Sequence, residues 1–121
     1  MRMTNLDPTL SIRDQLSEDC APAVLVNLFT LARADEAEFL AAWTQDAAFM
    51  KVQPGCISIQ LHRAVGPNAT YLNHAVWESV AAFREAFSSP EFSANLARYP
   101  ASAVAAPHLF QRVAVPSVCV A

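Results

Sequence analysis

The 121-residue sequence lacks the short motifs by which many enzyme classes are identified. It has no GxSxG nucleophile elbow, no HExxH zinc motif, no P-loop and no GxGxxG dinucleotide fingerprint. Because these motifs are absent, the sequence gives no support for an α/β-hydrolase, an HExxH metalloprotease, a P-loop nucleotidase or a Rossmann dehydrogenase. Chemistry has to be inferred from single residues that are out of place in the hydrophobic pattern.

Cysteines are few and are not spaced for cross-linking. Cys20, Cys56 and Cys119 are an odd number without a CxxC pair, so neither a disulfide framework nor a zinc site is expected. Free thiols suit a reducing compartment, and the first twenty residues lack the apolar segment of a secretion signal. We expect a cytoplasmic protein without a metal site.

Neither positive charge nor long apolar runs are abundant. The 8 Lys and Arg are scattered among 11 Asp and Glu, for a net charge of −3. This pattern favours neither a nucleic-acid partner nor an anionic membrane surface. No run approaches the roughly 18 apolar residues of a bilayer-spanning helix. With 54% hydrophobic and 16% charged residues, the composition is typical of a globular domain that buries some apolar surface between subunits.

A regular change of hydrophobic period is what the sequence does contain. Alternating β-branched and aromatic residues predict strands, and apolar residues at helical spacing predict helices. The expected strands are 23–31, 56–63, 71–77 and 108–115. One helix is expected to follow Asp35 and end before Pro54, and a second to follow Ser79 and restart at Pro90.

The order of these elements predicts an α+β, ferredoxin-like βαββαβ fold with a four-stranded antiparallel sheet and both helices on one face. The uncovered face would meet solvent or a partner, so we expect a homodimer that pairs two sheets. The predicted domain is 23–115, with an N-terminal arm at 1–22 outside the core and a C-terminal tail at 116–121. In a dimer, the arm would be able to cover the mouth of the partner's pocket.

Two polar residues fall on the apolar side of the predicted hairpin. If Arg63 pairs with Tyr71, the side of the second strand that carries Asn73 and Trp77 faces the helices. The expected cross-strand pairs are Leu61–Asn73, Ile59–Ala75 and Ile57–Trp77. In this register His62 lies on the other face, and a one-residue shift would bring it to the helix side.

Asn27 is a third polar residue on an apolar face. It is predicted to lie on the same side of the first strand as apolar neighbours. A buried carboxamide without a partner costs about 1–3 kcal/mol, so each must bind backbone, water or a ligand. Two interpretations remain open. Either the asparagines bind backbone at a strand edge while Trp77 fills the core, or all three line an apolar pocket that has a few placed polar groups.

The sequence resembles the antibiotic biosynthesis monooxygenase family, whose members are dimeric α+β barrel proteins. The resemblance covers about residues 23–115 and is carried by "QPGCISIQLHR", "LNHAVWESVAAFREAF" and "SSPEF". It implies oxygenation without any cofactor. In such a reaction a phenol or anthrone loses a proton, its anion transfers an electron to O₂, and the resulting hydroperoxide loses water to give a quinone. The implied partners are a small aromatic substrate and O₂.

The site residues that the resemblance implies transfer only in part. The stretch "NHAVW" reproduces the family's N-x-x-x-W pair at Asn73 and Trp77, which would hold a substrate oxygen and a peroxy intermediate. The tyrosine of the quinone-forming members falls on Phe83, and their arginine falls on Ala97. The expected catalytic residues are Asn73, Trp77 and His62, and the expected substrate-binding residues are Asn27, Phe83 and Phe87. The role of His62 as a base depends on the one-residue register shift.

Two other functions remain as alternatives. A non-catalytic, dimeric binding or stress-associated protein would use the same barrel for a hydrophobic metabolite. A haem-degrading branch of the fold has an asparagine that Asn27 matches, but its tryptophan and histidine fall on Ala86 and Leu96. Without an imidazole ligand for the iron, haem degradation is the least expected of the three.

Overall fold

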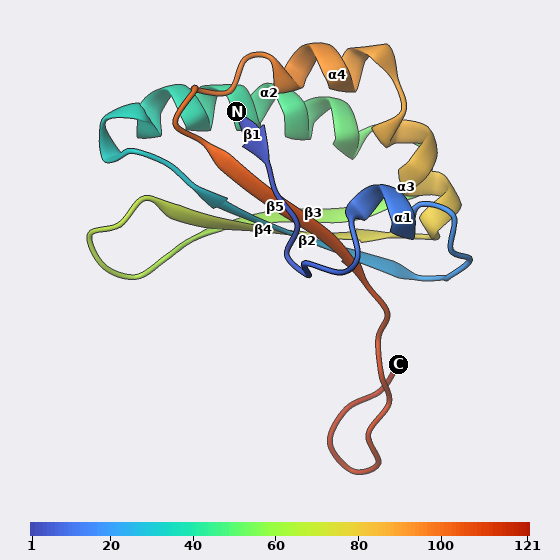
Figure 1. Ribbon diagram of the computed structural model, residues 1–121. Coiled ribbons are helices and arrows are strands. Elements are labelled where there is room, and N and C mark those ends of the chain that lie inside the picture. Colours follow the sequence, from blue (N-terminus) through green and yellow to red (C-terminus); the bar gives the residue numbers. More distant parts are fainter.

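The computed structural model describes residues 1–121 as one β-sheet with helices lying over one of its faces (Figure 1). In chain order the elements are β1 (Arg2–Met3), α1 (Ile12–Gln15), β2 (Ala23–Thr30), a 3₁₀ turn (Arg33–Asp35), α2 (Glu36–Lys51), β3 (Cys56–Arg63), β4 (Thr70–Trp77), α3 (Val80–Phe87), α4 (Pro90–Leu96) and β5 (Val104–Phe110). From β2 onward this is the predicted βαββαβ order, and the fold is ferredoxin-like α+β.

The sheet has five strands in the order β1-β5-β2-β4-β3, so the prediction of a strictly four-stranded antiparallel sheet is wrong. The extra strand is β1, which runs parallel to β5. Its backbone donates from Arg2 N to Ala103 O at 2.9 Å and from Thr4 N to Ala105 O at 2.8 Å. A two-residue strand is too short to show a hydrophobic period, and it forms here because it covers an otherwise unpaired edge of β5.

The last strand is Val104–Phe110 and not the predicted 108–115. The prediction began the strand after Pro107, whereas this proline lies inside it. The carbonyl groups of Ala103 and Ala105 point to the outer edge, where β1 binds them. Pro107 lies two residues after Ala105, so its backbone faces the same outer edge of β5. The N–H that proline lacks would therefore point away from β2, and no hydrogen bond between the two strands is lost. Its register partner on β2 is Asn27.

The N-terminal arm packs onto its own chain, which corrects the expectation that residues 1–22 lie outside the core. Ile12 is buried in the larger core cluster. The Gln15 side chain binds the edge of β5 as another strand would, since its Oε1 accepts from Leu109 N at 2.8 Å and its Nε2 donates to Leu109 O at 2.9 Å. Arg84 Nη1 of α3 donates to Leu16 O at 2.7 Å and holds the end of α1.

The core lies between the sheet and the helices and divides into two clusters. Trp77 and Phe83 belong to the larger cluster, and Phe39 to the smaller one. These three are the largest fully buried side chains. Edge-to-face contacts join aromatic rings within each cluster, with centroids 5.6 Å apart for Trp77–Phe83 and 5.0 Å for Phe29–Phe39. Such pairs contribute about 0.5–1.5 kcal/mol beyond the area they bury.

The predicted register of the hairpin is confirmed over most of its length. Arg63 pairs with Tyr71, and the next facing pairs are Leu61–Asn73 and Ile59–Ala75. The pair Ile57–Trp77 is wrong, because a bulge between Cys56 and Ser58 places Cys56 opposite Trp77. The extra residue in the bulge turns Ile57 outward, where its side chain is 59% exposed.

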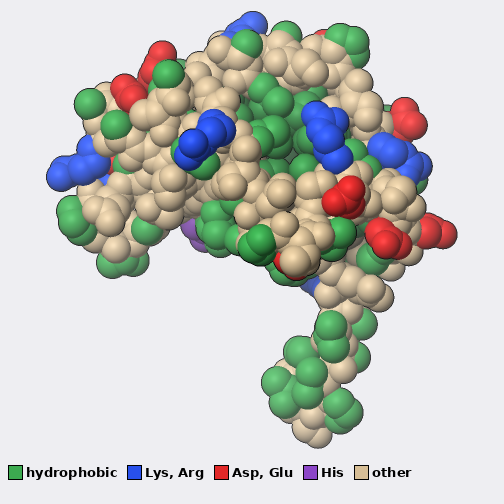
Figure 2. Space-filling view, viewed as in Figure 1, with side chains coloured by type: hydrophobic (Ala, Val, Ile, Leu, Met, Phe, Trp, Pro, Cys, Tyr) green, Lys and Arg blue, Asp and Glu red, His purple; other side chains and the backbone are tan.

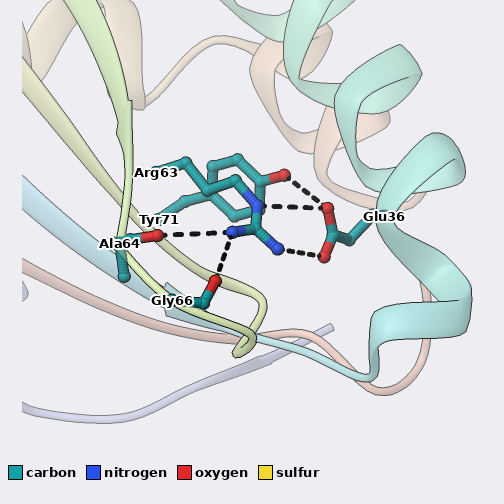
Figure 3. A network of polar contacts seen from close by, with 5 residues as sticks. All are labelled: Glu36, Arg63, Ala64, Gly66 and Tyr71. Atoms are coloured by element: carbon teal, nitrogen blue, oxygen red, sulfur yellow. Dashed lines mark hydrogen bonds and ion pairs between the residues drawn. The ribbon is translucent and has the colours of Figure 1, made fainter.

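Helix α2 is fixed to the β3–β4 hairpin by a polar cluster at its first turn (Figure 3). Arg63 Nη2 donates to Glu36 Oε1 at 2.8 Å, and its Nε donates to Oε2 at 3.3 Å. Tyr71 Oη donates to the same Oε2 at 3.0 Å, and Arg63 Nη1 also donates to Gly66 O at 3.0 Å. The Arg63 hydrogen bonds, and then that of Tyr71, hold the pKa of Glu36 below its usual value.

The capping signals behave largely as predicted. Ser79 Oγ accepts from Ala82 N at the start of α3, and Ser89 Oγ accepts from Phe92 N at the start of α4, with Pro90 in the first turn. Asp35, in contrast, makes no cap to α2 and accepts a hydrogen bond from Ser102 Oγ at 2.6 Å instead. No helix is both long enough and apolar enough to cross a bilayer.

Candidate functional site

A cavity lies between the helix-facing side of the sheet and helices α2, α3 and α4. Twenty residues line it, and sixteen of them are hydrophobic. It encloses about 620 Å³ not filled by atoms, its mouth included, although the centre of a water-sized sphere can move through only about 50 Å³. Figure 2 shows hydrophobic side chains gathered in a hollow beside α4 on this face of the molecule. Because so little of the cavity is open to a water-sized sphere, a fused aromatic ligand would need some lining side chains to move.

The lining includes side chains that can make such room. Met1 and Met3 from the N-terminal segment, together with Met50 of α2, reach the cavity. Methionine side chains are unbranched and adapt to irregular spaces. The segment expected to cover a partner's pocket thus lines the pocket of its own chain.

The strands place two carboxamides opposite one another in this apolar wall. Asn27 of β2 pairs with Asn73 of β4, and both line the cavity. Their Oδ1 atoms are buried and have no hydrogen-bond partner. The interpretation that these oxygens bind backbone at a strand edge is therefore wrong. Both strands are also internal to the sheet, so the backbone groups beside these residues are occupied by the sheet itself.

Trp77 lies four residues beyond Asn73 on the same face of β4 and also lines the cavity. Its side chain is 1% exposed, yet Nε1 has no acceptor. An unmade hydrogen bond of this kind costs about 1–3 kcal/mol. Three unpartnered polar atoms around one apolar cavity indicate a site prepared for a ligand with oxygen atoms, because plain core would not contain them.

Phe83 and Phe87 of α3, which are predicted from the sequence to contact a substrate, both line the cavity. Their ring centroids lie 5.4 Å apart, and Phe87 continues the row to Phe92 of α4 at 5.0 Å. The three rings form an aromatic wall, and the contact between Phe83 and Trp77 extends this wall to the indole. Such a wall suits a flat, apolar ligand.

Asp46 of α2 is a lining residue that the sequence interpretation missed. Tyr99 Oη donates to Asp46 Oδ2 at 2.7 Å, whereas Oδ1 is buried and has no partner. Burial raises the pKa of Asp46 to about 6, and the Tyr99 hydrogen bond opposes part of this rise. Burial also raises the pKa of Tyr99, as does the neighbouring carboxylate. Tyr99 therefore stays protonated and acts as the donor.

A signal for Asp46 was present in the sequence. Trp43, Ala47 and Met50 repeat at helical spacing, and Asp46 falls in the same stripe of the helix. A carboxylate in an apolar stripe is out of place in the same way as a carboxamide on an apolar strand face.

His62 is not part of the cavity, which corrects its assignment as a possible base. The confirmed register pairs it with Leu72, on the face of the sheet that carries no helices, and its side chain is exposed. The one-residue shift on which its role depended does not occur. His74 pairs with Gln60 on that same face. His108 is buried, with its Nε2 3.2 Å from Gln15 Nε2, and does not line the cavity either.

No group of three or more His, Cys, Asp and Glu side chains is arranged to hold a metal ion. The cavity presents neutral hydrogen-bonding atoms and one carboxylate in apolar surroundings. Such an arrangement is able to bind a hydroxylated ring, to move a proton, and to keep water away from a reactive anion.

Comparisons with known proteins agree on one family. A family model described as antibiotic biosynthesis monooxygenase matches residues 22–98. Deoxynogalonate monooxygenase from Streptomyces nogalater is 36% identical over 74 residues, which cover 61% of this chain and 62% of that enzyme. The match thus spans less than two thirds of the enzyme.

Solved structures give the same result. SnoaB, described as a cofactor-independent oxygenase from Streptomyces nogalater, superposes with a TM-score of 0.73 and 30% identity over 81% of this chain and 99% of its own. A putative monooxygenase from Shewanella loihica has a TM-score of 0.66 and 27% identity, with coverage of 78% and 97%. A putative antibiotic biosynthesis monooxygenase from Caulobacter crescentus, at 22% identity and a TM-score of 0.69, shares the fold.

Proposed function

The chain belongs to the antibiotic biosynthesis monooxygenase family, and from this premise we propose that it is a cofactor-independent monooxygenase that oxidises a phenol- or anthrone-like substrate with O₂. One observation carries the proposal. Besides Asp46 Oδ1, the apolar cavity holds three neutral buried polar atoms without partners, which are Asn27 Oδ1, Asn73 Oδ1 and Trp77 Nε1. The similarity to a monooxygenase and to a cofactor-independent oxygenase supports the same reaction class.

Each polar atom has a chemical task in such a reaction. A substrate hydroxyl is able to donate to the carboxamide oxygens, and either amide is able to donate through its nitrogen if it rotates. The indole N–H of Trp77 is a donor only, so it suits an oxygen that gains negative charge, such as a phenolate or a peroxide. The apolar wall disfavours water, which would otherwise compete for these groups.

The reaction balances without a cofactor when the substrate supplies the electrons. The substrate loses a proton, and its anion transfers one electron to O₂. The two radicals then combine through a carbon–oxygen bond, and the resulting peroxide anion takes back a proton to give a hydroperoxide. Loss of water from the hydroperoxide leaves one oxygen atom in the product as a carbonyl. Overall, a CH₂ group and O₂ become C=O and H₂O.

Oxygen uptake with dithranol, an anthrone, tests the proposal. The purified, metal-stripped protein is compared with Trp77→Phe, with Asn73→Ala and with Asn68→Ala, whose asparagine is exposed in the hairpin loop. We expect quinone-forming uptake above autoxidation for the parent and for Asn68→Ala, and at least about a tenfold loss for the two cavity variants. Binding of dithranol without uptake above autoxidation would contradict the proposal.

A non-catalytic protein that binds a hydrophobic metabolite is the second candidate. The observation that favours it is Phe83, a cavity residue whose side chain has no hydroxyl where the resemblance to the quinone-forming members implies a tyrosine. The dithranol experiment separates the two functions, because ligand binding would persist without oxygen consumption.

We further propose that two copies pair through the face of the sheet without helices. That face presents apolar side chains from its central strands, among them Val26 and Leu28 of β2 with Leu72 and Val76 of β4. Light scattering after size-exclusion chromatography is expected to give twice the 13.1 kDa of the chain. Leu72→Lys is expected to shift the mass to that of a monomer, because a buried lysine without a partner opposes association. A monomeric parent protein would contradict this.

A further inference from the structure

We propose that Asp46 is the catalytic base of this site, and that Tyr99 is a positioning residue that orients its carboxylate. The inference rests on the proposed function, because it names the group that accepts the substrate's proton in that cavity. The carboxylate is unused by the hydrogen bonds that hold the fold together, apart from the one from Tyr99.

The carboxylate and the carboxamides lie on different walls of the cavity. Asp46 belongs to α2, which covers the sheet, whereas Asn27 and Asn73 belong to the strands. A flat ring between helix and sheet would meet all three. A hydroxyl held by a carboxamide would then have the carboxylate as its proton acceptor.

The two oxygens of Asp46 have different environments. Oδ2 accepts the hydrogen bond from Tyr99 Oη at 2.7 Å, and Oδ1 is buried without a partner. One oxygen held by a donor fixes the rotation of the group, and the other remains free for a ligand. This is the arrangement expected of an oriented general base, in which a second residue sets the position of the first. A carboxylate kept only for structure would have both oxygens bonded.

Proton movements through Oδ1 balance over the reaction. Oδ1 first takes the hydroxyl proton of the phenol, or of the enol form of an anthrone, and leaves the electron pair on the substrate anion. After O₂ has added, the peroxide anion takes that proton back. The carboxylate then removes the remaining C–H proton as the O–O bond breaks. The departing hydroxide receives this proton and leaves as water, so Asp46 ends the cycle ionised.

The surroundings give this carboxylate a suitable basicity. Burial raises the pKa of Asp46 to about 6, so it is a stronger base than an exposed aspartate and is still ionised at neutral pH. The lining from the N-terminal segment, the strands, α3 and α4 includes no other charged side chain. Tyr99 is the one other titratable side chain in the lining, and its raised pKa keeps it a donor.

Anaerobic mixing with dithranol tests the base directly, because deprotonation of the ligand shifts its absorption to longer wavelength. The parent protein, Asp46→Asn and the control Asp19→Asn, whose aspartate is exposed, are compared at pH 7. Quenching of tryptophan fluorescence measures binding separately from deprotonation. We expect the anion band with the parent and the control, and at least a tenfold weaker band with Asp46→Asn at equal occupancy. Equal anion bands in all three proteins would overturn the proposal.

The same experiment separates the base from the oxygenase. An Asp46-dependent anion band together with no oxygen uptake after admission of air would contradict the proposed function and would still support Asp46 as the base. When air is admitted to an active protein, uptake by Asp46→Asn is expected to be about 100-fold lower than that of the parent. A loss of less than threefold would speak against catalysis by Asp46.

Tyr99→Phe tests the positioning role with a readout that a purely structural effect would not change. The Tyr99 hydrogen bond lowers the pKa of Asp46, so its removal is expected to move the acid limb of the kcat/KM profile to higher pH. Tyr71→Phe also removes a hydroxyl that donates to a carboxylate, at Glu36, and Tyr71 lies outside the cavity. It is expected to leave the acid limb in place. An unchanged limb in Tyr99→Phe would remove Tyr99 from the proposal.

Discussion

Asn27 and Asn73 face one another across the β2–β4 pair, and neither side-chain Oδ1 has a hydrogen-bond partner. Every residue in these strands contributes its backbone to the sheet, so the two carboxamides and the Trp77 N–H are the unpartnered polar groups in an otherwise apolar wall. A fold selected for stability alone would place aliphatic residues there. The pair therefore gives up stability at a site where a ligand would satisfy it.

Asn73→Leu is expected to separate stability from function. Leucine has nearly the same shape and needs no hydrogen bond, so the free energy of unfolding should stay level or rise by about 1 kcal/mol. Oxygen uptake should fall at least about tenfold because the substrate loses a hydrogen-bonding group. Urea unfolding and uptake assays on the same sample measure both, with Asn68→Leu as the control. A loss of stability above about 2 kcal/mol would show that Asn73 has a structural partner.

Trp77→Phe is expected to cost both stability and activity. The indole is fully buried against Phe83. The smaller phenyl ring leaves a gap that is expected to lower the free energy of unfolding by about 1–3 kcal/mol. To separate the gap from the lost N–H, Val80→Ala serves as a comparison that makes a gap in the same core cluster, at a residue that does not line the cavity. Uptake that falls equally in both variants would assign the loss to packing and not to the Trp77 N–H.

The buried Asp46 carboxyl is expected to make stability depend on pH. Its folded pKa of about 6 is raised above the ordinary 3.8, so the folded state binds the proton more tightly than the unfolded state. Stability relative to Asp46→Asn should therefore decrease as the pH rises from about 4 to about 6 and stay constant above that. The difference is on the order of 2–3 kcal/mol. Asparagine keeps an acceptor for Tyr99, and a difference that grows in the opposite direction would contradict the raised pKa.

The Glu36 cluster is expected to give the opposite dependence. Its pKa is lowered by Arg63 first and Tyr71 second, so the folded state favours the ionised form. Stability from this cluster is present above pH of about 4.5 and is lost as the pH falls below that value. Arg63→Gln should lower the melting temperature at pH 7 and lower it by less at pH 3. An equal effect at both pH values would show that Arg63 acts through its backbone contacts at Gly66.

The bond between Gln15 and Leu109 is expected to hold the N-terminal segment in place. Gln15→Ala removes both hydrogen bonds to the Leu109 backbone, at a cost of about 1–3 kcal/mol. Hydrogen exchange at the Leu109 amide should become faster, while exchange in β4 stays slow. Ser17→Ala is the control, because its hydroxyl bonds only within the segment. Unchanged exchange at Leu109 would mean that water or another group replaces the amide.

How far the sequence predicts this site depends on the kind of pattern involved. Alternation in the hairpin and the paired carboxamide and indole on one strand are local, so the register, the cavity face of Asn73 and Trp77, and the family resemblance followed from residue order. The bulge at Cys56 could not be predicted from the sequence. The apolar residues at the start of this strand fit an alternating pattern with or without one extra residue. It reversed the expected position of Ile57.

By itself, the sequence determined the order of the elements, the caps of α3 and α4, and which face of β4 meets the helices, because hydrogen bonding and periodicity act between near neighbours. Only the tertiary structure decided that β1 joins β5, that Gln15 closes the strand edge, and that the Asp46 carboxylate meets Tyr99 from a position 53 residues away in the chain. These contacts join distant segments, and their geometry exists only once the helices lie on the sheet. For that reason the cavity residues of the strands and the two phenylalanines of α3 were predicted, and the Asp46 carboxylate of α2 was found only in the folded chain.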